Sequence, residues 1–152
     1  MASASGELRV ELRGVMPAPP QRVFRALTEP AELARWWGPD GFSTPGIELD
    51  LRVGGRYRFA MQPPDGELFY LQGEFVELDP PNMVAYTFRW EDPDPDDVET
   101  VAKLTLREFE DGAALTLEQG VFATEARQAL HQQGWTDSFE KLRQWLLSET
   151  GP

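Results

Sequence analysis

The 152-residue chain contains no cysteine and a single histidine. Without cysteine it can form no disulfide, no thiolate metal site and no cysteine nucleophile, which fits a reducing compartment. One histidine cannot supply a paired-histidine zinc motif, and neither a nucleophile elbow nor a phosphate-binding glycine loop is present. We therefore expect no metal and no cofactor.

Positive charge is also scarce. Lys and Arg together number 14, Asp and Glu number 26, and the formal net charge is −12. The arginines are scattered along the chain, and a chain this acidic repels phosphate backbones. We expect neither a nucleic-acid partner nor binding to anionic membranes, and we attribute the charge to solubility.

Long apolar runs are missing as well. No run approaches the roughly 18 residues that a membrane helix needs. Residues 1–6 have neither the basic nor the apolar region of a signal peptide. We expect a cytoplasmic protein that forms a single domain over residues 1–152, with residues 1–6 flexible, because this length matches one ordinary domain.

Several segments alternate between apolar and polar residues with a period of two, as half-buried strands do. These expected strands cover about residues 8–12, 47–53, 57–61, 68–78, 84–90, 98–109 and 113–119. After the first strand, apolar residues at helical spacing predict two short helices, which Pro30 separates and Gly38-Pro39 ends. A long helix is expected from about Glu125 to Ser148, with Thr124 as its N-cap.

Three connecting features carry more specific expectations. Gly54-Gly55 predicts a tight reversal whose glycines permit positive φ. A break in the alternation around Gly73 predicts a β-bulge. The acidic, proline-interrupted segment 91–99 predicts a solvated loop, because it lacks the ligand order of a calcium-binding loop.

The order of these elements predicts an α+β fold. In the last helix, Trp135, Phe139, Leu142 and Leu146 fall on one stripe. An antiparallel sheet needs its apolar face covered, and only this helix is long enough to cover it. We expect the helix to pack across the sheet.

Most aromatic side chains face the interior of this arrangement. The residues predicted to line a cavity there are Trp36, Trp37, Phe42, Tyr57, Phe59, Tyr86, Phe88, Trp90, Trp135 and Phe139. Aromatic-rich hollows of about 300–1,000 Å³ are the usual form of small-molecule pockets. The alternative is that the rings simply fill the core at ordinary packing density.

His131 lies one helical turn before Trp135, so we expect its side chain to reach the mouth of the cavity. A histidine can act as an acid or a base near neutral pH. Catalysis also needs an orienting partner and a positioned electrophile, of which the sequence gives no sign. We assign His131 to ligand binding and predict no catalytic residue.

Four segments together carry a family signature. They are residues 18–39, which end in Trp36-Trp37-Gly38-Pro39, residues 50–59 around Gly54-Gly55, residues 73–90 around Asp79-Pro80-Pro81, and Gly134-Trp135. In content and order they resemble bacterial homologues of the activator of the heat-shock-protein-90 ATPase. That family is part of the START-like, or SRPBCC, helix-grip superfamily, and the resemblance covers nearly the whole chain.

The resemblance implies a helix-grip fold, in which a curved antiparallel sheet wraps around a long C-terminal helix. It also implies a cavity between the sheet and that helix, where relatives in the superfamily bind lipids, hormones or polyketides. Some relatives are cyclases or dehydratases, and the family takes its name from a eukaryotic co-chaperone. Fold alone does not choose among these functions.

Three functional hypotheses follow. The leading hypothesis is non-enzymatic binding of a small hydrophobic or aromatic molecule in the cavity, so that a small apolar ligand is the expected partner. The first alternative is a polyketide cyclase-like or dehydratase-like enzyme that uses Tyr57, Tyr86 or His131 as acid–base groups. The second is a co-chaperone-like activator of a heat-shock-protein ATPase; a homodimer and a chaperone partner are left open.

Overall fold

The computed structural model describes residues 7–150 of the chain, with side chains described through residue 148. The expectation for residues 1–6 lies outside this range. The helices and strands are, in chain order, β1 (Arg9–Met16), α1 (Pro20–Thr28), α2 (Pro30–Trp36), β2 (Ser43–Leu49), β3 (Arg56–Gln62), β4 (Phe69–Asp79), β5 (Met83–Trp90), β6 (Thr100–Phe109), β7 (Gly112–Gly120) and α3 (Glu125–Thr150).

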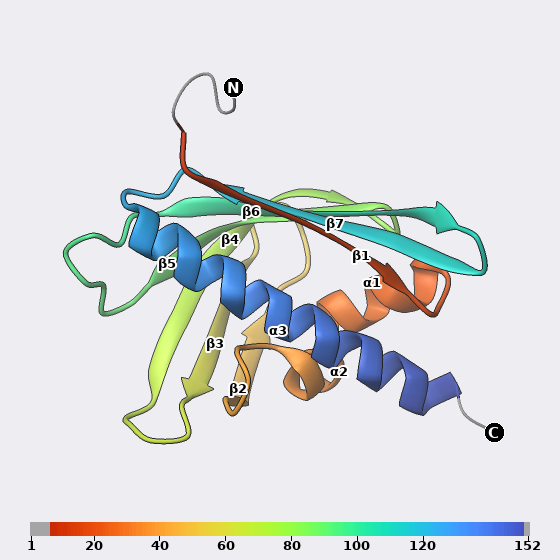
Figure 1. Cartoon of the computed structure of the whole chain (residues 1–152), viewed down its shortest axis with the longest axis horizontal. Coiled ribbons are helices and arrows are strands. Elements are labelled where there is room, and N and C mark those ends of the chain that lie inside the picture. The colour runs from red at the N-terminus through yellow and green to blue at the C-terminus, as the bar shows by residue number, and fades with distance from the viewer. Residues whose placement is uncertain (1–6, 151–152) are drawn as a thin grey trace.

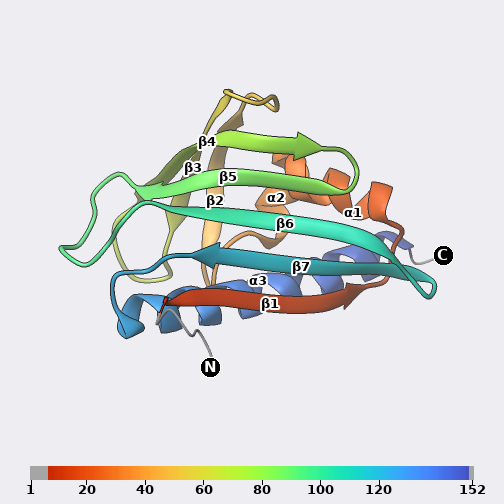
Figure 2. The same ribbon diagram turned by 90° about the horizontal axis from the view of Figure 1, so that it is seen from above.

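One antiparallel sheet organises the fold. Its seven strands run in the order β1-β7-β6-β5-β4-β3-β2. The sheet is strongly curved, and the long helix α3 crosses its concave side (Figure 1). Seen from above, α3 runs beneath β1 and β7 in Figure 2. The predicted α+β helix-grip architecture, with two short helices after the first strand, is confirmed.

Helix α3 begins where the sequence predicts. The Thr124 Oγ1 accepts a hydrogen bond of 3.1 Å from the Arg127 backbone N–H, as an N-cap residue does. The predicted stripe of Trp135, Phe139, Leu142 and Leu146 is buried at 5 % exposure or less. The stripe therefore anchors the helix to the sheet through the hydrophobic effect.

The two short helices are placed by proline and tryptophan. Pro20 and Pro30 occupy the first turns of α1 and α2, where a missing N–H costs little. The Trp36 indole lies fully inside and donates to the Ala26 carbonyl oxygen at 2.9 Å, which joins the two helices. Trp37 follows directly, as the C-cap of α2 with extended backbone.

The reversal at Gly54-Gly55 differs from the prediction. Strand β2 ends at Leu49, and Val53 is 59 % exposed. Gly54 has the expected positive φ of 87°, but Gly55 does not. A Cβ on Gly55 would lie 2.0 Å from the Asp50 carbonyl oxygen, so this glycine is required by close approach of two backbones.

The β-bulge is displaced from its predicted place. The register between β4 and β5 shifts between Phe75 and Glu77, not at Gly73. Gly73 instead allows close packing of strands, because a Cβ there would lie 2.0 Å from the Thr87 carbonyl oxygen. Within residues 7–150, no helix is both long and apolar enough to cross a membrane.

Candidate functional site

A pocket of about 400 Å³ lies between the first half of α3 and strands β3 to β5. Two loops complete its wall: the α2–β2 loop and the acidic β5–β6 loop. The residues that line it are Trp37, Gly38, Pro39, Phe42, Met61, Phe69, Tyr70, Phe88, Trp90, Asp92, Asp94, Arg127, Leu130, His131, Gly134, Trp135 and Ser138. The pocket is thus walled mainly by aromatic and apolar side chains.

Trp37 is the centre of the apolar wall. Its ring centroid lies 5.2 Å from that of Trp135 on α3, and 6.5 Å from that of Phe88 on β5. On its other side it meets the edge of the Phe59 ring at 4.9 Å. The extended backbone at the end of α2 therefore places one indole against both the helix and the sheet.

A second aromatic group continues the wall toward β4. The Phe69 ring lies 6.2 Å from Phe42 and 5.3 Å from Trp90. Phe88 meets Trp90 at 5.4 Å in an edge-to-face arrangement. Such contacts fix the rings relative to one another, so this wall is preformed.

The α2–β2 loop is fastened to α3 by polar side chains. The Ser138 Oγ accepts from the Gly38 N–H and donates to the Gly38 carbonyl, both at 3.1 Å. The Lys141 ammonium donates to the Pro39 carbonyl at 3.2 Å, and burial lowers the pKa of this lysine. The loop that carries one rim of the pocket is held in place by the helix that carries the other.

Trp135 owes its orientation to a buried polar partner. Its Nε1–H donates to the Gln119 side-chain oxygen on β7 at 2.7 Å. Gly134, immediately before it, lines the pocket without a side chain, and a Cβ there would lie 3.7 Å from Pro39 Cγ. The helix therefore presents one fixed ring and one open position to the pocket.

His131 lies one turn before Trp135 and is surrounded by rings. Its centroid is 4.7 Å from Phe122, 5.3 Å from Phe88 and 6.1 Å from Trp90. Burial, aided by the positive charge of Arg127, lowers the pKa of His131 to about 4. The imidazole is consequently neutral at physiological pH.

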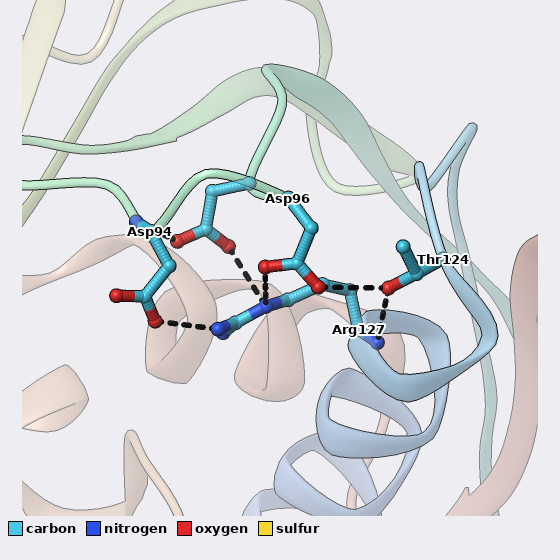
Figure 3. Close-up of polar contacts among 5 residues, drawn as sticks. Asp94, Asp96, Thr124 and Arg127 are labelled. Atoms are coloured by element: carbon cyan, nitrogen blue, oxygen red, sulfur yellow. Dashed lines mark hydrogen bonds and ion pairs between the residues drawn. The ribbon is translucent and has the colours of Figure 1, made fainter.

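Arg127 ties the β5–β6 loop to the first turn of α3. Its guanidinium contacts the carboxylates of Asp94, Asp96 and Asp97, the latter two at 3.0 and 3.4 Å from Nε. The Thr124 hydroxyl donates to Asp96 as well, and this bond together with Arg127 holds the pKa of Asp96 below its usual range. Figure 3 shows the Asp94 and Asp96 carboxylates beside the Arg127 guanidinium, with the Thr124 hydroxyl beside Asp96.

Six of the predicted cavity residues line this pocket, namely Trp37, Phe42, Phe88, Trp90, His131 and Trp135. The other five, Trp36, Tyr57, Phe59, Tyr86 and Phe139, do not. Trp36 points between α1 and α2, where its indole is bonded to Ala26. Phe139 packs over Gly14 of β1, where a Cβ would lie 3.1 Å from its ring.

Tyr57, Phe59 and Tyr86 form a packed cluster instead of a cavity wall. Tyr57 lies 5.0 Å from Phe59 and 5.2 Å from Tyr86 between ring centroids. Its hydroxyl donates to the Thr87 carbonyl at 2.6 Å. Burial raises the pKa of both tyrosines, so neither ionises readily. For these three rings the alternative prediction, a filled core, describes what is observed.

The sequence interpretation missed the rest of the lining. Phe69 and Tyr70, at the start of β4, line the pocket but are not among the predicted residues. Asp92 and Asp94 were assigned to a solvated loop, yet both line the pocket and Asp94 is held by Arg127.

The pocket wall contains the titratable side chains of Tyr70, Asp92, Asp94, Arg127 and His131. Among residues 7–148 no group of three or more His, Cys, Asp or Glu side chains is arranged to hold a metal ion. Three of the four aspartates of the β5–β6 loop, Asp94, Asp96 and Asp97, surround a guanidinium instead. What the pocket offers is apolar surface, aromatic edges and a neutral imidazole.

A curved sheet around a long helix, with an aromatic pocket between them, defines a helix-grip protein. The family model described as activator of Hsp90 ATPase homolog 1-like protein matches residues 17–146. The chain therefore belongs to this family. No curated protein matches the sequence.

Solved structures of bacterial proteins agree with this membership. A protein from Chromobacterium violaceum is 30% identical, with a TM-score of 0.84 over 91% of this chain and 96% of its own. The AHSA1 protein from Silicibacter pomeroyi is 27% identical, with a TM-score of 0.81 over 93% of this chain and 99% of its own. CalU16 from Micromonospora echinospora is 25% identical, with a TM-score of 0.70 over 91% and 75%.

Proposed function

We propose that the chain binds a small hydrophobic molecule in the aromatic pocket between α3 and strands β3 to β5. The observation that carries the proposal is the combination of about 400 Å³ of space with a preformed aromatic wall. Pockets for small molecules usually have this size and lining. Apolar contact with the rings supplies affinity through the hydrophobic effect.

The glycine at position 134 supports the same proposal. Glycine in a helix interior costs about 1 kcal/mol relative to alanine. Packing does not demand this cost, because a Cβ would make only an ordinary contact of 3.7 Å with Pro39. The absence of a side chain at position 134 is explained if the pocket must stay open for a ligand.

Acid–base catalysis is less well supported. Tyr57 and Tyr86, two of the three groups it would use, lie outside the pocket wall, and burial raises the pKa of both. His131 lines the pocket, but no carboxylate among the described residues hydrogen-bonds to its imidazole to orient it. The family description names activation of an Hsp90 ATPase, and no feature of residues 7–148 favours that role over ligand binding.

The test is a binding titration with N-phenyl-1-naphthylamine, an uncharged fluorescent probe, monitored by probe fluorescence and thermal stability. At 100 times its Kd a ligand adds about 2.7 kcal/mol to the free energy of unfolding. Gly134→Leu, which places a side chain in the pocket, should abolish binding while the circular dichroism spectrum stays native. The matched control is Thr136→Leu, because Thr136 is exposed on the same helix and does not line the pocket. Equal binding by both variants would show that the probe binds elsewhere, against the proposal.

A further inference from the structure

His131 places a polar ring inside an aromatic part of the pocket wall. It contacts the rings of Phe88, Trp90 and Phe122. Within the described part of the chain, no side chain or backbone group hydrogen-bonds to either imidazole nitrogen. A neutral imidazole has one donor and one acceptor nitrogen, so both functions are free for a bound molecule.

Three other polar groups of the wall are committed to protein partners. The Ser138 hydroxyl is bonded to both backbone groups of Gly38. The Trp135 indole N–H is bonded to Gln119. Arg127 is surrounded by carboxylates. Tyr70, near the start of β4, also lines the pocket, and the Arg58 guanidinium lies over its ring at 3.7 Å.

The charges around His131 disfavour an ionised ligand. Among the described residues that line the pocket, the one cationic side chain, Arg127, faces three carboxylates, and Asp92 adds a further carboxylate to the wall, so no free cation is available to pair with an anionic group. A cationic group beside His131 would meet the desolvation that already keeps the imidazole neutral. An uncharged group meets neither penalty.

We propose that His131 selects the ligand of this pocket by hydrogen bonding, and that the ligand is an uncharged aromatic molecule bearing a hydroxyl or carbonyl group. The aromatic part lies among Trp37, Phe88 and Trp135, and the polar group meets the imidazole. This inference rests on the proposed function, because it requires that the pocket binds a ligand.

The experiment compares four probes of one shape: naphthalene, 2-naphthol, 2-naphthoate and 2-naphthylmethylamine, the last a cation at neutral pH. Binding is followed by quenching of tryptophan fluorescence, since Trp37, Trp90 and Trp135 line the pocket. A neutral hydrogen bond predicts that 2-naphthol binds about fivefold to tenfold more tightly than naphthalene. Tighter binding of either charged probe than of 2-naphthol would overturn the inference.

Variants test whether His131 causes the tighter binding of 2-naphthol relative to naphthalene. His131→Phe should bring the ratio of the two affinities close to one, and His131→Gln, which can still hydrogen-bond, should restore part of it. Because each ratio compares two probes in the same variant, changes in pocket size cancel. Tyr70→Phe is the matched control, as it removes the phenol hydroxyl of another ring of the wall. Loss of the preference in Tyr70→Phe but not in His131→Phe would overturn the assignment.

Nuclear magnetic resonance tests whether His131 contacts the ligand, because a merely structural role would leave its imidazole resonances unchanged on ligand binding. His131 is the only histidine, so every imidazole signal of the protein belongs to it. Titration with 2-naphthol should shift the imidazole nitrogen resonances, and titration with naphthalene should shift them much less. Equal shifts would overturn the hydrogen bond, yet the proposed function would stand if Gly134→Leu abolished naphthalene binding. If no probe bound the native protein, both proposals would fail.

Discussion

Gln119 of β7 and Trp135 of α3 are joined inside the protein by a hydrogen bond of 2.7 Å. Gln119 is only 1% exposed, and its amide also donates to the Thr100 hydroxyl on β6 at 2.8 Å. A buried polar side chain of the sheet thus fixes the ring that forms part of the pocket wall. Buried polar groups cost free energy unless they are paired, so this chain of bonds specifies a single arrangement of helix on sheet.

Gln119→Met should lower the free energy of unfolding by about 1–3 kcal/mol, because the Trp135 N–H is left buried without an acceptor. In Trp135→Phe that N–H is already absent, so the same Gln119 change should cost less. Urea denaturation of the native protein, both single variants and the double variant gives the coupling energy between the two residues. Strictly additive effects would contradict a specific bond.

His131 makes stability depend on pH in a calculable direction. Its pKa is lowered to about 4 by burial and by Arg127, whereas an unfolded histidine titrates near 6.5. The unfolded chain therefore binds the proton more readily, and stability from the neutral imidazole is complete above pH 6.5. It is lost as the pH falls toward 4, by about 3 kcal/mol in all.

His131→Asn removes this titration while keeping a polar side chain. Its stability relative to the native protein should therefore improve as the pH falls from 6.5 to 4. Urea denaturation at several pH values measures that difference, and acidic groups common to both proteins cancel. A difference that is constant with pH would show that the imidazole titrates normally in the folded protein.

The ion pairs of Arg127 should matter more than those of exposed arginines. Arg127→Gln leaves Asp94, Asp96 and Asp97 facing one another, so the free energy of unfolding should fall, and fall further at low salt. Arg52→Gln is the control, because Arg52 pairs with Asp50 where both side chains are more than half exposed. Its effect should be several times smaller.

Hydrogen exchange in segment 92–98 provides a second measure of the Arg127 contacts. The segment should exchange faster in Arg127→Gln than in the native protein, because its attachment to α3 is lost. Unchanged exchange, together with equal unfolding midpoints for Arg127→Gln and Arg52→Gln, would contradict a role for Arg127 in holding the loop.

The fold could be predicted because its signals are local. The stripe from Trp135 to Leu146 follows from helical period, and the N-cap at Thr124 and the first-turn proline Pro20 follow from backbone chemistry. The pocket could be predicted only in part. Strand parity places Tyr57 and Phe88 on the inner face, but it does not tell which ring meets another ring and which meets open space.

The features that could not be predicted depend on contacts between residues far apart in the sequence. Asp94 and Arg127 are 33 residues apart, and the pattern of either segment alone indicates only a solvated surface. Likewise, Gly73 is read as a bulge signal, whereas the backbone atom it approaches belongs to Thr87 on the neighbouring strand. Distances of this kind arise from strand pairing and are not encoded in local periodicity.

Gly134→Ala should raise stability and weaken binding at once. Alanine gains about 0.5–1 kcal/mol over glycine in a helix interior, and its Cβ would meet Pro39 at an ordinary 3.7 Å. The same methyl group enters the pocket, so the affinity for 2-naphthol should fall.

The control is Thr136→Ala, which improves helix propensity outside the pocket and should leave the affinity for 2-naphthol unchanged. Urea denaturation and fluorescence titration test the two effects separately. Higher stability with unchanged affinity would mean that position 134 lies away from the bound molecule, whereas lower stability would mean that the helix needs glycine for packing.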